Sequence, residues 1–287
     1  MSWGPWIEDS FSKKEVIICI PGNPGLPGFY AEFMKTIHKN INPNIPVWLI
    51  GQAGHDEPPE DSLHEIPPLK GNEDLYDLDA QLEFIHMFVP SDVKIHLIGH
   101  SIGAWMIIEM LKKEPSLRHK IQHSYLLFPT IERMAASPNG SFFTKVTQRL
   151  APVIIALFNE FPRFILSPLL SLFFWMKSIP SSILDTTLMF ARGTILKKVF
   201  FLAGEEMKRV VELDSETLEI LRSNHRNLTF LYGDRDLWTP SKYWEELEEK
   251  IPEIDLIVTH FEHAFILKSS VEMGKLLAEW IERGTGY

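Results

Sequence analysis

Ser101 lies in a sequence context typical of a nucleophilic serine. The stretch Gly99–Gly103, which reads G-H-S-I-G, follows an apolar run at Val93–Ile98 and precedes a helical pattern at Ala104–Leu111. A strand, a tight turn and a helix in this order form a nucleophile elbow, which exposes the serine hydroxyl at the edge of a sheet. The two glycines leave room for the strained backbone of such a turn. We therefore predict that Ser101 attacks a carbonyl group.

A serine nucleophile needs a histidine to accept its proton and an acid to orient that histidine. In hydrolases with an elbow of this kind, the acid and then the histidine follow the serine along the chain. Asp234 and Asp236 come directly after the apolar run Leu228–Tyr232. The end of a parallel strand would place them at the same sheet edge as Ser101. The residues alone leave both aspartates open as the acid.

Two histidines follow the next apolar run, Asp255–Val258. His260 stands at the end of this run, where a side chain packs or caps. His263 comes a few residues later, where the chain can turn over the sheet edge toward Ser101. We predict that His263 is the base.

The oxyanion formed in such a reaction needs two backbone N–H donors. The residue after the nucleophile, Ile102, can supply one of them. The loop Pro21–Gly25 follows an early strand and can supply the other. Proline has no N–H, so Gly22 and Asn23 remain as the candidates in this loop.

Short apolar runs alternate with helical patterns, which is typical of a mostly parallel sheet covered by helices. The predicted strands are Val16–Ile20, Val47–Ile50, Lys94–Ile98, Ser124–Phe128, Leu228–Tyr232 and Asp255–Val258. The predicted helices are Phe29–His38, Asp74–Val89, Ile102–Lys113, Lys242–Lys250 and Val271–Arg283.

The interval after Phe128 breaks this alternation, because a structureless loop of that length is implausible. We expect a core formed by residues 1–129 and 227–287, with residues 130–226 as an inserted helical cap. Two apolar runs, Leu150–Phe158 and Phe164–Met176, form the centre of the insertion. Neither approaches the ~20 residues that span a bilayer. They predict two short helices joined by a polar, proline-containing bend.

The insertion also differs from the remainder of the chain in charge. Residues 141–200 hold seven basic and two acidic side chains, a net charge of +5, whereas the whole chain carries −10. An apolar, basic segment suits a surface of anionic lipid headgroups, which it would bind without crossing the membrane. The alternative is a cap that simply covers the active site. The acidic total argues against nucleic acid as a partner.

The residues give little support for a cysteine nucleophile, a metal site or a nucleotide cofactor. The single cysteine, Cys19, lies in an apolar run and is expected to be a buried strand residue rather than a nucleophile. His55 follows a predicted strand and is given a structural role. The histidines show no ligand spacing, so we expect no metal, and the glycine-rich loop matches no nucleotide fingerprint, so we expect no cofactor.

With these residues in place, the chain resembles the lipid droplet-associated hydrolase family over nearly its whole length. The matching stretches are I-P-G-N-P-G at 20–25, A-G-H at 53–55, L-I-G-H-S-I-G at 97–103, L-L-F-P-T-I-E-R-M at 126–134, S-P-N-G at 137–140, Y-G-x-x-D-x-W at 232–238 and H-A-F at 263–265. The stretches at 126–134 and 21–25 are not general features of hydrolases, which makes the match specific.

The resemblance implies an α/β-hydrolase fold and a triad of Ser101, Asp236 and His263. It favours Asp236 as the acid, because a G-x-x-D turn carries the acid in similar hydrolases. It also favours Asn23 as the oxyanion donor of the loop, because the residue after the loop glycine donates its N–H in those proteins. Ile102 is the second donor. Family members look longer before the first strand and begin with extra antiparallel strands. The resemblance therefore does not predict which strands form the edge of the sheet near the N-terminus.

The resemblance also implies a location on lipid droplets and the endoplasmic reticulum, at the cytosolic face, and a role in cholesterol and triglyceride homeostasis. We expect a carboxylic ester hydrolase, of the sterol esterase or lipase type, that forms an acyl-enzyme on Ser101. Cholesteryl ester or a similar neutral lipid is the expected substrate, and the residues name no protein partner. Two alternatives stay open: a droplet surface protein with weak catalysis, and an acyltransferase that uses the same triad.

Overall fold

The computed structural model describes residues 1–3, 15–56, 66–90 and 93–283. Within them lies a seven-stranded sheet with the strand order β1-β3-β2-β4-β5-β6-β7. The strands are β1 (Ser2–Trp3), β2 (Glu15–Ile20), β3 (Val47–Leu49), β4 (Lys94–His100), β5 (Ile121–Leu127), β6 (Leu228–Gly233) and β7 (Asp255–Thr259). All neighbours pair in parallel except β1, which runs antiparallel to β3 at one edge. The mostly parallel sheet is thereby confirmed, and β1 is a short antiparallel addition.

The inner strands are buried on both faces. Along β2, Val16, Ile18 and Ile20 enter one hydrophobic core, and Ile17 and Cys19 enter the other. Successive side chains of a strand point to opposite faces, so a strand between two cores is apolar at nearly every position. This is why the strands read as continuous apolar runs in the sequence.

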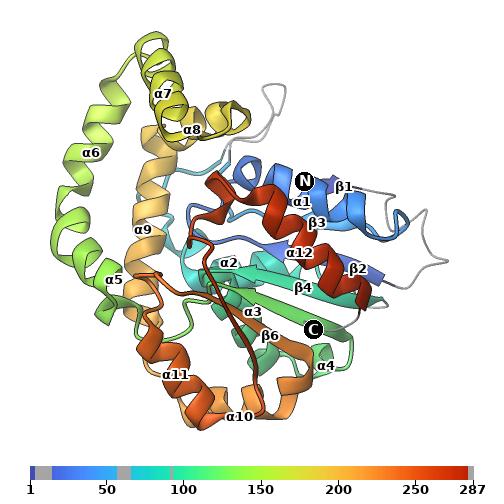
Figure 1. Cartoon of the computed structure of the whole chain (residues 1–287). Coiled ribbons are helices and arrows are strands. Elements are labelled where there is room, and N and C mark those ends of the chain that lie inside the picture. The colour runs from blue at the N-terminus through green and yellow to red at the C-terminus, as the bar shows by residue number, and fades with distance from the viewer. Residues whose placement is uncertain (4–14, 57–65, 91–92, 284–287) are drawn as a thin grey trace.

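Helices cover both faces of the sheet (Figure 1). α1 (Pro27–Asn40) and α12 (Ser270–Arg283) pack against each other and share the core on one face. The core on the other face includes α2 (Leu78–His86), α3 (Ile102–Lys113), α10 (Ser215–Asn224) and α11 (Ser241–Lys250). A short helix, α4 (Pro115–Arg118), follows α3.

The predicted helix Asp74–Val89 is wrong in extent. The structure instead has a short 3₁₀ turn at Glu73–Leu75, and α2 begins only at Leu78. The side chain of Asp77 accepts a hydrogen bond from the N–H of Ala80 and so caps the first turn of α2. The apolar spacing of the sequence continues through Asp77, so it does not indicate that a helix begins there. Aspartate is favoured directly before a helix because its side-chain oxygen accepts a backbone N–H of the first turn.

Between β5 and β6 the chain forms a series of helices that stands at the carboxyl ends of the strands (Figure 1). They are α5 (Pro138–Phe142), a π-helical turn (Phe143–Thr147), α6 (Gln148–Glu160), α7 (Arg163–Lys177), α8 (Leu184–Phe190) and α9 (Gly193–Arg209), followed by α10. α6 and α7 confirm the two short apolar helices. α9 packs against α6 and lies between it and the sheet (Figure 1), whereas α10 packs on α3.

Among the described residues, no single helix has both the length and the apolar composition to cross a membrane. Two consecutive helical segments, Pro138–Asn159 and Arg163–Lys177, are long and apolar enough when they are taken together. They meet, however, at a bend of 113°.

Candidate active site

The three predicted catalytic side chains meet at the carboxyl ends of their strands. Ser101 follows β4, Asp236 follows β6 and His263 follows β7. His263 Nε2 lies 3.0 Å from Ser101 Oγ, and His263 Nδ1 lies 2.6 Å from Asp236 Oδ2. A hydroxyl, an imidazole and a carboxylate joined in this way can move a proton off the serine while it attacks a carbonyl.

The backbone at Ser101 has the strained conformation of an elbow. Ser101 has φ 55° and ψ −120°, and its N–H donates to the carbonyl of Leu127 at 2.9 Å. A Cβ on Gly103 would collide with the carbonyl oxygen of Ile20, and one on Gly99 would lie 2.8 Å from the backbone nitrogen of Ala104. The turn therefore depends on both glycines, which let α3 start against the neighbouring strand.

Asp236 is held as a carboxylate by three donors. Besides His263, the N–H of Trp238 donates to Oδ1 at 2.8 Å and the hydroxyl of Thr239 donates to Oδ2 at 2.9 Å. Burial alone would raise the pKa of Asp236, but these hydrogen bonds and the nearby His263 keep the pKa below its ordinary value. An ionised Asp236 can fix the Nδ1–H tautomer of His263 and leave Nε2 free to accept the proton of Ser101.

The alternative acid and base form a separate pair. His260 Nδ1 lies 2.6 Å from Asp234 Oδ2, and the side chain of His260 is 96 % exposed. Among the described residues, no hydrogen bond joins either of them to Ser101 or His263. The geometry thus places Asp236 and His263 beside the nucleophile, and Asp234 and His260 at the surface.

A second histidine, His100, supports the site, and sequence reasoning missed it. The N–H of Gly22 donates to Tyr30 Oη at 2.9 Å, and Tyr30 Oη lies 2.5 Å from His100 Nδ1. His100 Nε2 lies 2.9 Å from the carbonyl oxygen of His263. Burial, and then the proximity of His263, lower the pKa of His100 to about 3, so the ring is neutral. Its Nε2–H therefore donates to the carbonyl, and the Tyr30 hydroxyl donates to Nδ1.

This network also separates the two loop candidates for the oxyanion. Because the N–H of Gly22 is engaged by Tyr30, Asn23 is the one of these two candidates whose N–H has no acceptor within the described part of the chain. A Cβ on Gly22 would lie 2.9 Å from the Cβ of Ser101, so the loop runs against the nucleophile. Ile102 is the first residue of α3, where an N–H has no partner within the helix.

A cavity of about 380 Å³ borders Ser101 and His263. Its apolar walls come mainly from the insertion and from the loops after β6 and β7. The apolar lining residues include Phe29, Met134, Phe143, Phe190, Val199, Phe200, Ala203, Met207, Trp238, Ile266 and Leu267. Such a cavity accepts a hydrophobic ligand next to the nucleophile.

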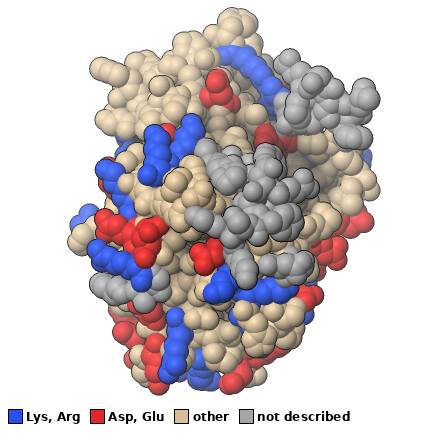
Figure 2. Space-filling model, turned by 90° about the vertical axis from the view of Figure 1, so that its right-hand side faces the viewer, with Lys and Arg blue, Asp and Glu red and all other residues tan. Residues whose placement is uncertain are grey.

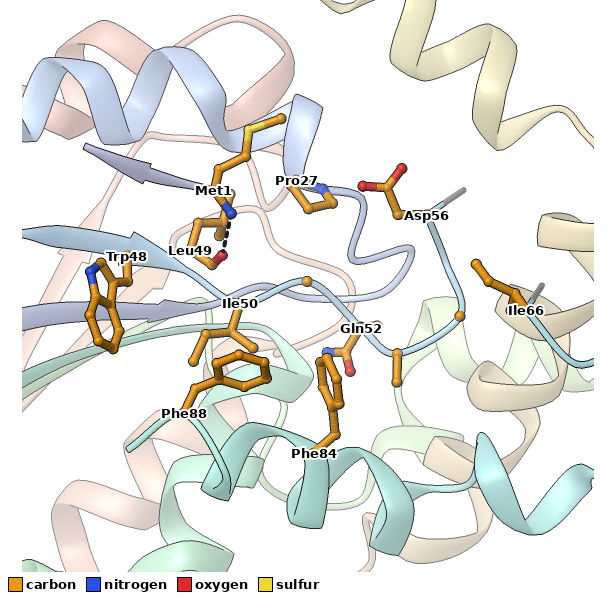
Figure 3. A pocket seen from close by; sticks show the side chains of 13 residues that line it. Met1, Pro27, Trp48, Leu49, Ile50, Gln52, Asp56, Ile66, Phe84 and Phe88 are labelled. Carbon is orange, nitrogen blue, oxygen red and sulfur yellow. Dashed lines mark hydrogen bonds between the residues drawn. The ribbon is translucent and has the colours of Figure 1, made fainter. Parts of the chain in front are cut away.

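A second cavity, of about 490 Å³, lies beside the end of β3 (Figure 3). Its lining includes Trp48, Ile50, Phe84 and Phe88, and Gln52 forms part of its wall. It contains none of the predicted site residues. We therefore assign the candidate active site to the smaller cavity, which holds the reactive groups.

Cys19 is fully buried in β2, and burial raises the pKa of its thiol well above the usual range. A buried thiol of this kind is a poor nucleophile. Among the described residues, no group of three or more His, Cys, Asp or Glu side chains could hold a metal ion.

Sequence comparison identifies close relatives of the chain. The family model described as lipid-droplet associated hydrolase matches residues 13–266. A lipid droplet-associated hydrolase of Drosophila melanogaster is 45 % identical over 292 residues, which cover 98 % of this chain and 94 % of the relative. The protein of the same description from Homo sapiens is 35 % identical over 295 residues, which cover 96 % of this chain and 89 % of the relative.

Solved structures with the same fold share little sequence with the chain. A putative lipase from Acinetobacter baumannii superposes with a TM-score of 0.63 at 14 % identity, covering 99 % of this chain and 86 % of the lipase. The α/β hydrolase MGS-M2, from a deep-sea metagenome library, has a TM-score of 0.60 at 14 % identity, covering 98 % and 92 % of the two chains. These likenesses confirm the expected α/β-hydrolase fold.

Proposed function

The chain belongs to the lipid-droplet associated hydrolase family, and from this premise we propose that it is a serine hydrolase that cleaves a hydrophobic carboxylic ester at a droplet surface. The observation that carries the proposal is the pair of hydrogen bonds that joins Ser101 to His263 and His263 to Asp236. This arrangement borders an apolar cavity rather than open solvent. The triad, the ester bond and the acyl-enzyme below are parts of the proposal.

In the first half of the reaction, His263 Nε2 takes the proton of Ser101 as Oγ attacks the ester carbonyl. Asp236 stabilises the imidazolium that forms. The N–H groups of Asn23 and Ile102 bind the oxyanion of the tetrahedral intermediate. When the intermediate collapses, His263 returns its proton to the leaving alcohol, and the acyl group remains on Ser101.

In the second half, water takes the place of the alcohol. His263 accepts a proton from this water, the water oxygen attacks the acyl carbonyl, and the same two N–H groups bind the oxyanion. Collapse returns the proton to Ser101 Oγ and releases a carboxylic acid. Throughout both halves, the hydrogen bond from His100 to the His263 carbonyl holds the main chain of the base in place.

The apolar walls of the cavity favour a neutral lipid as the substrate. Its volume of about 380 Å³ is near the lower end of the ~300–1,000 Å³ usual for small-molecule sites. Cholesteryl ester, the substrate that the resemblance suggests, and the acylglycerols are the candidates. Hydrolysis of either would give the protein a role in cholesterol and triglyceride homeostasis.

The droplet surface would contact the outer face of α6 and α7. Large apolar side chains are exposed there, and Phe164 and Trp175 are 79 % and 78 % exposed. Others on these helices are Leu150, Val153, Leu157, Phe158, Ile165, Leu169, Leu172, Phe173 and Met176. An exposed apolar face of this extent is typical of a membrane or partner interface.

Basic side chains accompany this face and acidic ones are scarce. Lys145, Arg149, Arg163 and Lys177 lie on or beside α6 and α7. In Figure 2 the top of the molecule, where α7 and α8 lie, has few charged side chains, whereas charges of both signs cover the lower part. We therefore place this face in the headgroup layer of a droplet or of the endoplasmic reticulum, at the cytosolic side and without crossing the membrane.

A fluorophosphonate probe tests the nucleophile directly. The wild type should be labelled, and Ser101→Ala should not be labelled although it keeps the wild-type Tm. Wild type that has not been treated with the probe should also hydrolyse long-chain esters in a panel of neutral lipids. A folded wild type that the probe does not label would refute the assignment of Ser101.

The exposed face of α6 and α7 also supports a second candidate, a droplet surface protein with little catalysis. Expression of Ser101→Ala in cells that lack the protein separates the two. If the variant restores normal lipid storage, surface binding rather than hydrolysis is the function. An acyltransferase would use the same triad, and it is recognised by a new ester formed when a lipid alcohol is added to the assay.

A further inference from the structure

Two polar side chains of the active-site cavity have buried oxygens that the proposed reaction does not use. Glu206 on α9 is only 2 % exposed, and both Glu206 and Asn23 line the cavity beside Ser101. Among the described residues, neither Glu206 Oε1 nor Asn23 Oδ1 has a hydrogen-bond partner. A buried oxygen without a partner costs stability, and folded proteins hold few of them. The two oxygens therefore point to a polar group of a ligand.

The other hydroxyl and imidazole groups of the cavity already have partners within the protein. They are the side chains of Tyr30, His100, Ser101 and His263. Asn23 uses its Nδ2, which donates to the carbonyl oxygen of Val199 at 3.0 Å, but not its Oδ1. The amide oxygen of Asn23 and the carboxyl group of Glu206 are thus available to a substrate.

α9 places these two groups along one strip of the cavity wall. Val199, Ala203 and Glu206 lie on one face of the helix, and all three line the cavity. The carbonyl of Val199, which holds Asn23, points toward the helix C-terminus, whereas the side chain of Glu206 leans toward the N-terminus. The side chain of Ala203 between them is a single methyl group. A small polar part of a ligand therefore has room between Asn23 and Glu206.

The strip begins beside the place where the ester carbonyl would bind. The N–H of Asn23 is the proposed oxyanion donor, and only a few bonds separate it from Oδ1 of the same residue. In an ester of glycerol, only a few bonds separate the carbonyl group from the free hydroxyl groups of the alcohol. A hydroxyl group also suits both oxygens, because it donates one hydrogen bond and accepts others.

We propose that Glu206 and the side chain of Asn23 bind a free hydroxyl group of the substrate, which is a mono- or diacylglycerol rather than cholesteryl ester. The inference rests on the proposed function, because it names the alcohol part of the ester that Ser101 attacks. Cholesteryl ester has no hydroxyl group and would leave both oxygens buried without a partner. A site that hydrogen-bonds a hydroxyl group disfavours a ligand that lacks one.

The charge state of Glu206 agrees with this role. Burial raises its pKa to about 8, and the nearby side chain of Asn23 lowers the pKa in part. The carboxyl group is therefore mostly protonated at neutral pH, so it can donate to a hydroxyl oxygen as well as accept from a hydroxyl group. A protonated Glu206 also places no negative charge beside the developing oxyanion.

Two matched esters test the proposal on the wild type. Monooleoylglycerol and propyl oleate share the acyl chain and the length of the alcohol, but only monooleoylglycerol carries free hydroxyl groups. Both are presented at neutral pH and at the same mole fraction in the same detergent micelles, so the lipid surface does not differ. The kcat/KM for monooleoylglycerol should be at least about tenfold higher than that for propyl oleate.

Substitutions on α9 then show whether Glu206 causes this preference. Glu206→Met fills a similar space without a polar group, and its ratio of the two kcat/KM values should fall to within about threefold of one. If Glu206→Met does not fold, Glu206→Ala removes the carboxyl group without adding bulk and should lower the ratio in the same way. Glu205→Gln is the control on the same helix, where Glu205 pairs with Lys208 at 2.8 Å, and it should keep the wild-type ratio.

A wild-type ratio near or below one overturns the proposal and leaves the proposed function standing. A folded Glu206→Met or Glu206→Ala variant that keeps the wild-type ratio overturns it as well, because Glu206 would then not bind the hydroxyl group. Wild type that the fluorophosphonate probe does not label, and that hydrolyses neither ester, refutes the proposed function instead.

Discussion

Replacement of Asp236 by asparagine should abolish hydrolysis by fixing the wrong tautomer of His263. Asp236 Oδ1 accepts the N–H of Trp238, and a backbone N–H can only donate. In Asp236→Asn the amide oxygen must therefore stay at that position, and the NH₂ group replaces Oδ2. The NH₂ group then donates to His263 Nδ1, while the hydroxyl of Thr239 can turn to accept.

The expected size of the effect follows from this reversal. When Nδ1 of His263 accepts a hydrogen bond, the neutral ring must carry its proton on Nε2. Nε2 lies 3.0 Å from Ser101 Oγ. The ring can then no longer take the serine proton. A loss of this kind costs about 10⁴-fold in kcat, or roughly 5 kcal/mol of transition-state stabilisation. Little volume changes, so the variant should fold.

The assay compares Asp236→Asn with Asp234→Asn on the same long-chain ester, with Tm as the check on folding. Among the described residues, the Asp234 carboxylate pairs with the exposed His260 and not with His263, so its variant should keep kcat within about threefold of the wild type. If Asp236→Asn retains more than about a tenth of the wild-type activity, the tautomer argument is wrong. An inactive, folded Asp234→Asn would show that the other pair carries the chemistry.

Two further predictions concern the lipid surface and Glu206. Replacing both Phe164 and Trp175 by serine should remove about 3–6 kcal/mol of the free energy of transfer from water to the droplet, and should abolish flotation with artificial droplets. The double variant should still hydrolyse a soluble short-chain ester. Met87→Ser, which changes another exposed apolar residue, should float like the wild type. The pKa of Glu206 is raised from 4.5 to about 8, so the folded state binds this proton more tightly and loses stability as the pH rises through that window. Glu206→Gln lacks this loss. The difference in unfolding free energy between Glu206→Gln and the wild type should therefore grow from near zero below pH 4.5 to roughly 5 kcal/mol above pH 8. An advantage that does not change with pH would contradict this reasoning.

Much of the fold could be predicted because its signals are local. Strands buried on both faces must be apolar at each position, and the predicted strands overlap those of the structure. The order of serine, aspartate and histidine after three of the strands predicted Ser101 and His263 and left Asp234 and Asp236 open, and the resemblance favoured Asp236. The structure brings Ser101, Asp236 and His263 together at one sheet edge. The split of the predicted helix Asp74–Val89 was missed because the cap at Asp77 interrupts a pattern that periodicity alone continues.

The supporting contacts of the site could not be predicted, since they join residues that are distant along the chain. His100 touches Tyr30 from α1 and the carbonyl of His263, and Asn23 reaches α9 in the insertion. Nothing in the spacing of these residues indicates which of them meet. Asp234 and Asp236 are two residues apart in the same turn, and the direction of each side chain decides which one meets His263.

The hydrogen bonds of the site connect it both to the sheet and to the insertion. His100, next to Ser101 at the end of β4, is hydrogen-bonded to the carbonyl of His263, so the main chain at His263 is tied to the sheet. The proposed oxyanion donor, Asn23, is tied to α9, which packs against α6 of the outer apolar face. A displacement of α9, caused by contact of α6 with a lipid surface, would therefore reach the proposed oxyanion donor through the side chain of Asn23.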